Sequence, residues 1–448
     1  MNGHRPAAHS CQPGALSPPG STYATVDQLS KWGWTLADSQ PDRFRLREYG
    51  RSRAGEPLQV LSLGEGARQV LVVAGPHAGE PISGTTLPYL IRKLTGPGGH
   101  RALKQATWHL VLCADPDSAR LNEGWLSGPF TMAAAHRHFF RPAFAEQPEW
   151  LQPPSASSPP LPESAALVEL IDQLRPALQC SLHGLDIGGT YLQLTRDLPG
   201  VAHALAASAQ RHGIPLVLGG ADAPDWPTPG PGVYVMPSNE ADRFIALPDN
   251  IAVSTWTYAE RHGTVTAIIE VPMWAADAVA DLDPHPAAEA ALARSRARLR
   301  GNSLRIAKLL EHARPHLATS SSNLLRAVEE TLTISMQLAD EWDPEVRPAE
   351  ARPLPEPTIA RVARVRTVAH RLPLRAAAML QRLVSADQAP GGHSRAGQLT
   401  LVQQELNHFV AQGCSDFASA LGARWIPVPD QAEHQASMVL ASFDSLVG

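Results

Sequence analysis

The sequence predicts an α/β fold with a mixed central sheet between helices, followed by a mainly helical C-terminal region. Short apolar runs typical of strands alternate with segments of helical period up to about residue 284. A strand, a helix and a second strand follow one another over residues 69–117, which indicates a right-handed crossover and a parallel pair. Beyond Asp283 the chain becomes rich in Ala, Leu and Arg with helical spacing.

Composition excludes several classes of partner. The chain has 448 residues, 44% of them apolar, which is enough for a large core and two domains. A formal net charge of −5 gives no sign of a nucleic-acid partner, and no apolar run is long enough to suggest a membrane partner. Four scattered cysteines without a C-x-x-C pair argue against a disulfide framework and against thiolate zinc sites. We therefore expect a cytoplasmic protein.

Three parts are expected along the chain. Residues 1–22, rich in Pro and Gly and lacking a continuous apolar segment, are expected to be a disordered leader. Residues 23–284 are expected to form the α/β domain, and residues 285–448 a helical domain divided by the Pro-rich stretch 344–357. The helical domain has three open roles: packing or homo-oligomer formation, covering a cleft, or restricting substrate length.

The expected elements follow in chain order. Thr25 is the expected N-cap of a helix over 26–34, and residues 142–162, with seven prolines, favour an extended surface loop. Strands are expected at 44–49 and 58–64, joined as a hairpin, and at 70–73, 108–114, 178–182, 214–220 and 264–274. Helices are expected at 83–95, 163–174, 201–212, 287–313, 322–341, 358–384 and 398–421.

His77 and Glu80 come directly after the buried strand Val70–Val73. The loop past the carboxyl end of such a strand is where open α/β sheets place ligand crevices. An imidazole and a carboxylate three residues apart on a loop can converge on one cation, and they are a common pair of zinc ligands. An isolated H-x-x-E motif is more often a surface pair, so the rest of the chain must supply further ligands.

His183 and Glu270 supply the missing roles. His183 ends a predicted strand and completes the His₂Glu set of catalytic zinc sites, although a lone histidine there is more often a core residue. Glu270 is the single charge in an otherwise buried strand, where charges are rare unless paired or functional. It can act as general base and then as general acid toward a leaving nitrogen; the alternative is an ion pair with a core arginine.

From about Tyr23 to Trp274 the chain resembles the zinc carboxypeptidases of the M14 group. The motifs that carry this resemblance are Y-G-R-S-x-x-G-E-P-L at Tyr49–Leu58, H-A-G-E-P at His77–Pro81, L-H-G at Leu182–Gly184 and E-V-P at Glu270–Pro272. The resemblance implies a mixed, mostly eight-stranded sheet and one zinc ion per chain, held by His77, Glu80 and His183. It further implies that Glu270 is the general base.

The resemblance also suggests which cation stabilises the oxyanion and which groups bind substrate. Arg120, after the turn at 115–118, is the expected cation, with Arg137 and Arg141 in reserve. The alternative for each is a surface ion pair. The family's Asn-Arg pair, which grips a substrate carboxylate, is absent between Glu80 and His183, so Arg141, or Asn122 together with Arg120, would have to substitute.

Two further family features are altered or uncertain. The aspartate expected before the third ligand is replaced by Ser181, so the partner that orients His183 must come from elsewhere, and Asp186 is near in sequence. Tyr258, with Tyr234 second, is the candidate for a tyrosine that closes over the substrate; simple packing is the alternative.

The sequence thus predicts a zinc-dependent hydrolase of amide bonds, most simply a carboxypeptidase acting on a small peptide. An N-acyl amino acid deacylase of the succinylglutamate desuccinylase and aspartoacylase type is the alternative, because it shares the same ligand set. A non-catalytic binding module that keeps the cleft is the third possibility. The segment Tyr49–Leu58 favours the carboxypeptidase, whereas the missing Asn-Arg pair favours neither enzyme.

Overall fold

The computed structural model describes residues 20–152, 159–219, 226–237, 253–317, 322–346, 357–387 and 396–448. Nearly all of the predicted leader lies outside these residues. Among the helices of the described residues, none combines the length and apolar character that crossing a membrane requires.

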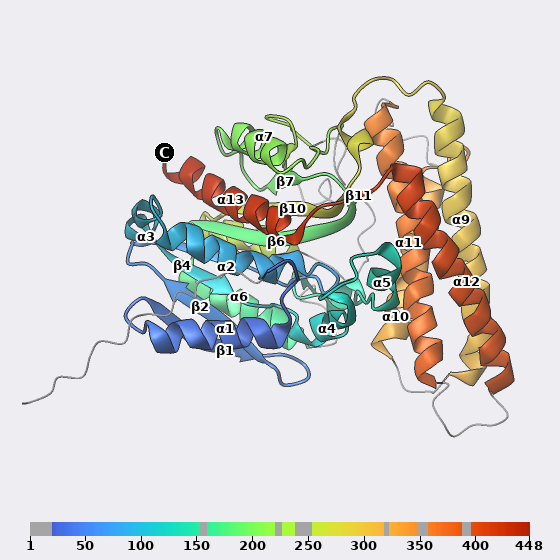
Figure 1. The fold of residues 1–448 in the computed structure, drawn as a ribbon, viewed down its shortest axis with the longest axis horizontal. Helices are drawn as coiled ribbons and strands as arrows, with labels where there is room; N and C mark the ends of the chain where they lie inside the picture. The colour runs from blue at the N-terminus through green and yellow to red at the C-terminus, as the bar shows by residue number, and fades with distance from the viewer. Residues whose placement is uncertain are drawn as a thin grey trace, which may run out of the picture.

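A nine-stranded mixed sheet forms the centre of the described part of the chain (Figure 1). Its main path has the order β1-β2-β4-β3-β6-β10-β7-β8, and β11 pairs with β10. The bounds are β1 (Phe44–Arg51), β2 (Pro57–Leu63), β3 (Arg68–Val73), β4 (Ala106–Val111), β6 (Leu178–Gly188), β7 (Tyr191–Leu194), β8 (Val233–Val235), β10 (Val265–Ala275) and β11 (Arg424–Trp425). A separate pair joins β5 (Trp150–Leu151) and β9 (Val253–Ser254).

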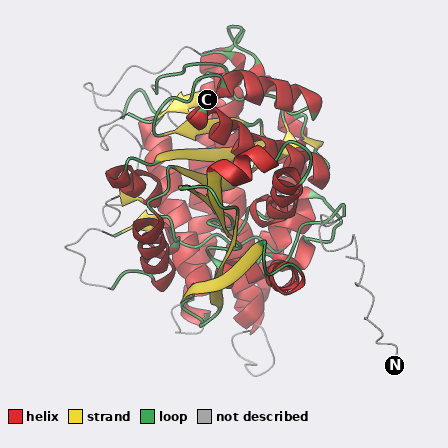
Figure 2. Cartoon of the chain, turned by 90° about the vertical axis from the view of Figure 1, so that its left-hand side faces the viewer, coloured by secondary structure: helices red, strands yellow, loops and turns green. Residues whose placement is uncertain are grey.

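Helices cover both faces of this sheet, which confirms the predicted architecture (Figure 2). The helices are α1 (Val26–Ser39), α2 (Ile82–Thr95), α3 (His100–Gln105), α4 (Pro116–Arg120), α5 (Met132–Arg137), α6 (Pro162–Leu174), α7 (Val201–Arg211), α8 (Thr255–Tyr258), α9 (Ala288–Ala313), α10 (Asn323–Glu341), α11 (Ile359–Asp387), α12 (Ala396–Leu421) and α13 (Val428–Val447). As predicted, Thr25 caps α1, in a capping box with Gln28.

The strand β3 shows why the sheet needs cover on both sides. Val70 and Val72 belong to the large core beneath α2, whereas Leu71 and Val73 pack in a second core with Leu167 of α6 and its neighbours. Successive side chains of a strand point to opposite faces, so a continuous apolar run is buried on both. β3 pairs in parallel with both β4 and β6, and its pairing with β4 confirms the predicted crossover.

Beyond the sheet, α9, α10, α11 and α12 pack against one another as a helical bundle, seen at the right of Figure 1. Each of these helices matches a range expected from the helical period of the sequence. The predicted boundary near residue 284 remains a prediction. The helical domain over residues 285–448 likewise stays a prediction. Within these residues β11 pairs with β10, and α13 packs on α2, α7 and β10.

Two expectations for the α/β part were wrong. Residues 214–219 do not form a strand: only a bridge between Thr190 and Leu216 occurs there, so the apolar run IPLVLG packs on the core without a ladder. The stretch 142–162 is not a surface loop throughout its described part, because Glu149 is fully buried and Trp150 nearly so. Trp150 packs edge-on against Trp256, and the gain from burying this aromatic surface draws the segment inward.

Helix α13 contacts the sheet through buried polar side chains. The amide Nε2 of Gln435 donates to the carbonyl oxygens of His183 (2.7 Å) and Ile269 (3.0 Å). His434 lies between the hydroxyls of Thr190 and Ser208, each 2.8 Å from a ring nitrogen. Buried polar groups are stable only when hydrogen-bonded, so these contacts fix one position of α13.

His434 predicts a pH dependence of stability. Burial lowers the pKa of His434 to about 3, far below the value in an unfolded chain. Below about pH 6.5 this histidine therefore binds a proton in the unfolded state but stays neutral in the folded state. The free energy of unfolding then falls as the pH drops from about 6.5 toward 3, by at most about 1.4 kcal/mol per pH unit. Urea unfolding of chelator-treated protein at pH 7, 6 and 5 should show a shallower decline in His434→Gln than in wild type.

The exposed His408 of α12 offers the matched control. The stability of His408→Gln should decline with falling pH as steeply as that of wild type. An equal slope in His434→Gln would contradict the assignment of this pH dependence to His434.

Candidate metal centre

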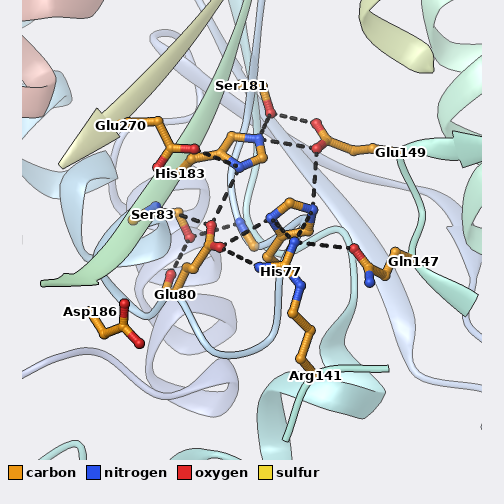
Figure 3. A network of polar contacts seen from close by, with 12 residues as sticks. His77, Glu80, Ser83, Arg141, Gln147, Glu149, Ser181, His183, Asp186 and Glu270 are labelled. Carbon is orange, nitrogen blue, oxygen red and sulfur yellow. Dashed lines mark hydrogen bonds and ion pairs between the residues drawn. The ribbon is translucent and has the colours of Figure 1, made fainter. Parts of the chain in front are cut away.

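His77, Glu80 and His183 meet just beyond the carboxyl end of β3, beside the middle of β6. One ligand atom from each lies within 4.8 Å of the others, and all three residues are buried. His77 and Glu80 stand on the loop after β3, and Gly184 N, in the neighbouring strand, donates to Glu80 Oε2 at 3.0 Å. The parallel pairing of β3 with β6 therefore brings together residues that are 103 positions apart, as Figure 3 shows.

The donor atoms fit a tetrahedral zinc ion. His77 Nδ1 lies 3.1 Å from Glu80 Oε1, and His183 Nδ1 lies 3.4 Å from Glu80 Oε2. Ligands about 2.1 Å from a tetrahedral zinc are about 3.4 Å apart, so each histidine nitrogen lies at about the distance from the Glu80 carboxylate that a shared zinc ion would span. The two rings cross nearly at right angles, with centroids 4.5 Å apart, which allows both Nδ1 atoms to face the same carboxylate.

The two histidines of the cluster have different electrostatic surroundings. Burial, reinforced by the charge of Arg141, lowers the pKa of His77 to about 4. Burial acts in the same direction on His183, but the charge of Glu149 and hydrogen bonds to Glu149 and Glu80 raise the pKa of His183 well above its usual value. Carboxylates thus surround His183, and positive charge among them is stabilised.

Glu149 is the residue that the sequence analysis missed. Its Oε2 lies 3.0 Å from His183 Nε2 and 3.8 Å from His77 Nε2, on the side of each ring away from Glu80. Its Oε1 accepts from Ser181 Oγ at 2.5 Å and from Trp256 Nε1 at 2.7 Å. Burial raises the pKa of Glu149, but the charges of His183 and His77 and the hydrogen bonds from His183 and Ser181 together leave that pKa below its usual range. One carboxylate therefore lies beside both imidazoles, within hydrogen-bond distance of His183 alone.

Glu149 also supplies the partner of His183 that the sequence left unidentified, because Ser181 replaces the expected aspartate. The partner that orients His183 comes from a distant loop, while Ser181 itself contacts both Glu149 and His183. The signal in the sequence was weak: Trp150, a large aromatic residue in a proline-rich stretch, argued against a surface loop. Asp186, the sequence-based candidate, instead pairs with Arg375 and Arg371 of α11.

Glu270 lies beside the ligands because of strand register. It is paired with His183 between the parallel strands β10 and β6, and paired positions in neighbouring strands present their side chains on the same face. Its Oε1 is 3.8 Å from His183 Nδ1, and its side chain is 11% exposed. The predicted charge in a buried strand is therefore directed at the cluster (Figure 3). The expectation that this strand would end at His183 was wrong, because β6 continues to Gly188.

The structure does not bring Arg120, Asn122 or Tyr258 into this cluster. Arg120 pairs with Asp27 at 2.7 Å and with Glu56 at 3.0 Å, which is the surface ion pair weighed as its alternative. The side chain of Asn122 bonds to backbone groups of Phe140 and Ser118.

The tyrosine and arginine candidates differ in position. Tyr258 donates to Asp172 and stacks on Arg261, and buried Tyr234 donates to the carbonyl of Val217. Arg137 is exposed. Arg141 alone among these candidates reaches the ligands: its Nη1 donates to Glu80 Oε1 at 2.9 Å, and its Nη2 lies 3.1 Å from His77 Nδ1.

Comparison with known proteins finds one family. Residues 29–124 match the family model described as zinc carboxypeptidase, Peptidase M14. This segment contains His77 and Glu80 but ends before Glu149, His183 and Glu270. A search of curated proteins found no significant match.

Solved structures give weak matches of the same kind. A metallo-carboxypeptidase from Burkholderia cenocepacia is 16% identical over 56% of this chain and 60% of its own, with a TM-score of 0.35. Carboxypeptidase A from Helicoverpa armigera is 13% identical over 56% and 65%, with a TM-score of 0.38. A murein-tripeptide amidase from Escherichia coli O157 is 20% identical over 51% and 82%, with a TM-score of 0.27.

This chain spans less than two thirds of both carboxypeptidases. Scores and identities at this level do not establish a shared activity. The family match, which is independent of them, confirms that the chain resembles the zinc carboxypeptidases of the M14 family over residues 29–124.

Proposed function

We propose that the chain is a zinc-dependent hydrolase that cuts an amide bond, and that it acts as a carboxypeptidase on a small peptide. The observation that carries this proposal is the convergence of His77, Glu80 and His183 beside the register-paired Glu270. Two imidazoles and one carboxylate leave a fourth ligand position for water or substrate, as catalytic zinc sites require.

Each residue near the cluster has a proposed task. His77, Glu80 and His183 hold one zinc ion, which when bound supplies Lewis acidity toward water and the substrate carbonyl. Glu270 takes a proton from the attacking water and passes it to the leaving nitrogen, so that one carboxylate acts first as base and then as acid. Arg141, 25% exposed and adjoining Glu80, replaces Arg120 as the proposed cation for the developing oxyanion.

The deacylase remains the second candidate. It uses the same four residues, and the substrate-gripping Asn-Arg pair that would favour a carboxypeptidase is absent between Glu80 and His183. A cytoplasmic location and a homo-oligomer remain predictions from the sequence.

Glu270→Gln should separate metal binding from catalysis. The variant should retain about one zinc per chain, because Glu270 is not a proposed ligand, while turnover falls by about 10²- to 10⁴-fold through loss of the proton acceptor. Elemental analysis gives the zinc content, and a panel of short peptides and N-acyl amino acids gives the activity and distinguishes the two enzymes. His183→Ala is the comparison variant and should lose both zinc and activity. If Glu270→Gln turned over substrate as fast as wild type, Glu270 would not be the general base. If wild type contained no zinc, only the hypothesis of a non-catalytic binding module would remain.

Glu149→Gln should weaken zinc binding without removing a ligand. The neutral amide removes the negative charge that lies 3.0 Å from His183 Nε2 and 3.8 Å from His77 Nε2, and loss of such a partner lowers metal affinity by about 10- to 100-fold. Competition with a chromogenic chelator measures the affinity. The matched control is Glu169→Gln on α6, where the side chain accepts an exposed hydrogen bond from Gln173. Equal affinities in the two variants would refute the orienting role.

A further inference from the structure

The helical bundle contains a cavity where α9, α11 and α12 meet, and Figure 1 shows these three helices side by side. Its volume is about 370 Å³. Pockets for small molecules span about 300–1,000 Å³, so the cavity is large enough for an organic ligand. None of the residues that line it belongs to the metal centre. The cavity, called the arginine pocket below, is lined among others by Arg294 and Arg298 of α9, Arg366 and His370 of α11, and Asp416 and Ser419 of α12.

The arginine pocket has an excess of positive charge. Three guanidinium groups and one carboxylate line it, which leaves two positive charges. The carboxylate of Asp416 neutralises them poorly: its Oδ2 lies 3.6 Å from Arg298 Nη1, and these side chains are 37% and 41% exposed, so the ion pair is weak. Arg294 and Arg298 stand four positions apart on α9, where like charges repel each other across one turn of the helix. An anion in the pocket would relieve this repulsion.

Two of the arginines keep unused hydrogen-bond donors. Among the described residues, Arg294 has no hydrogen bond or ion pair. Arg366 donates from Nη1 to the carbonyl oxygen of Ala420 at 3.2 Å and forms no ion pair within the same part of the chain. Because a guanidinium carries five N–H donors, both side chains can still bind the oxygens of a ligand.

His370 is a buried polar side chain at the wall of the same pocket. It is 8% exposed and stacks on Phe417, with ring centroids 5.7 Å apart, and its ring has no hydrogen-bond partner among the residues that the structure describes. Burial lowers the pKa of His370 to about 4, and the charges of Arg298 and Arg366 act in the same direction. Asp416 opposes this shift. The ring is therefore neutral near pH 7 and has one free N–H donor. Buried polar groups normally have partners, so this ring indicates a ligand.

We propose that the arginine pocket binds a small phosphate monoester. Such an ester carries close to two negative charges near pH 7, which matches the two excess positive charges of the lining. Its three terminal oxygens accept hydrogen bonds from several directions, and the guanidinium groups approach from two helices, whereas a carboxylate offers only two oxygens in one plane. The volume of the pocket leaves room for the organic part of the ester. The inference is independent of the proposed function, because it concerns other residues.

Calorimetric titration of zinc-loaded protein at pH 7 tests the proposed binding. The phosphate ligands are inorganic phosphate, glycerol 3-phosphate, glucose 6-phosphate and adenosine 5′-monophosphate. Glycerol, glucose and adenosine are the uncharged counterparts, and succinate supplies two carboxylates without phosphate. Wild type should bind at least one of the esters more tightly than inorganic phosphate or succinate, and should bind none of the uncharged compounds.

Arg294→Gln and Arg298→Gln should each raise the Kd of the preferred ester by about 10- to 100-fold, because each variant loses charged hydrogen bonds to the phosphate. Arg300→Gln is the matched control. Arg300 belongs to the same helix but pairs with Asp340 of α10 at 2.6 Å, so this variant removes the same charge outside the arginine pocket. Its Kd should stay close to that of wild type. Arg294 is exposed, so thermal unfolding of Arg294→Gln without ligand should also match wild type.

A phosphate compound can also bind a zinc ion, so the titrations are repeated on chelator-treated wild type, where binding to the arginine pocket should persist. Loss of binding on chelation would place the ligand at the metal centre and overturn the inference. It is also overturned if no ester binds, or if the Kd is the same in wild type, Arg294→Gln and Arg298→Gln. Binding of succinate, inorganic phosphate or an uncharged counterpart as tightly as the best ester would contradict the assignment to a phosphate monoester.

Discussion

The parallel pairing of β6 with β10 is the constraint on which the rest of the site depends. It places His183 and Glu270 at the same level on neighbouring strands, while β3, on the other side of β6, delivers the loop with His77 and Glu80. These groups carry like charges or lone pairs and would separate in a flexible chain. A one-residue slip would move every side chain of β10 to the opposite face and disrupt the close packing of the core on both sides, so the register is held by the core and not by the site itself.

Parts of the chain far from the ligands hold them in place. Gln435 of α13 bonds to the backbone carbonyl of His183, and Thr190 donates to that of Glu270. The loop that carries Glu149 is anchored by Trp150 and Trp256, and Phe144 N in the same stretch donates to Glu330 of the helical bundle. The C-terminal third of the chain is thus coupled to the strands that carry His183 and Glu270 through buried polar contacts, which are sensitive to geometry because an unsatisfied buried group is costly.

The sequence-based prediction was right for features that depend on residues close together in the chain. Val70–Val73 formed a buried strand because the apolar run had no polar alternation, and Thr25 capped α1 because its hydroxyl reaches the amide of Gln28. Arg120 was misplaced for an equally physical reason: its position after an acidic turn says nothing about which carboxylates fold beside it. In the structure Arg120 forms ion pairs with Asp27 and Glu56.

The sequence by itself determined the α/β class, the main strands and helices, and the identity of the residues that meet at the cluster, because periodicity and residue type are local properties. Only the tertiary structure decided that Glu149 would face both histidines, that Arg141 and not Arg120 would adjoin Glu80, and that α13 would return to the sheet. These are contacts between segments separated by up to hundreds of residues. They are chosen by the packing of the whole core, and no local pattern in the chain encodes them.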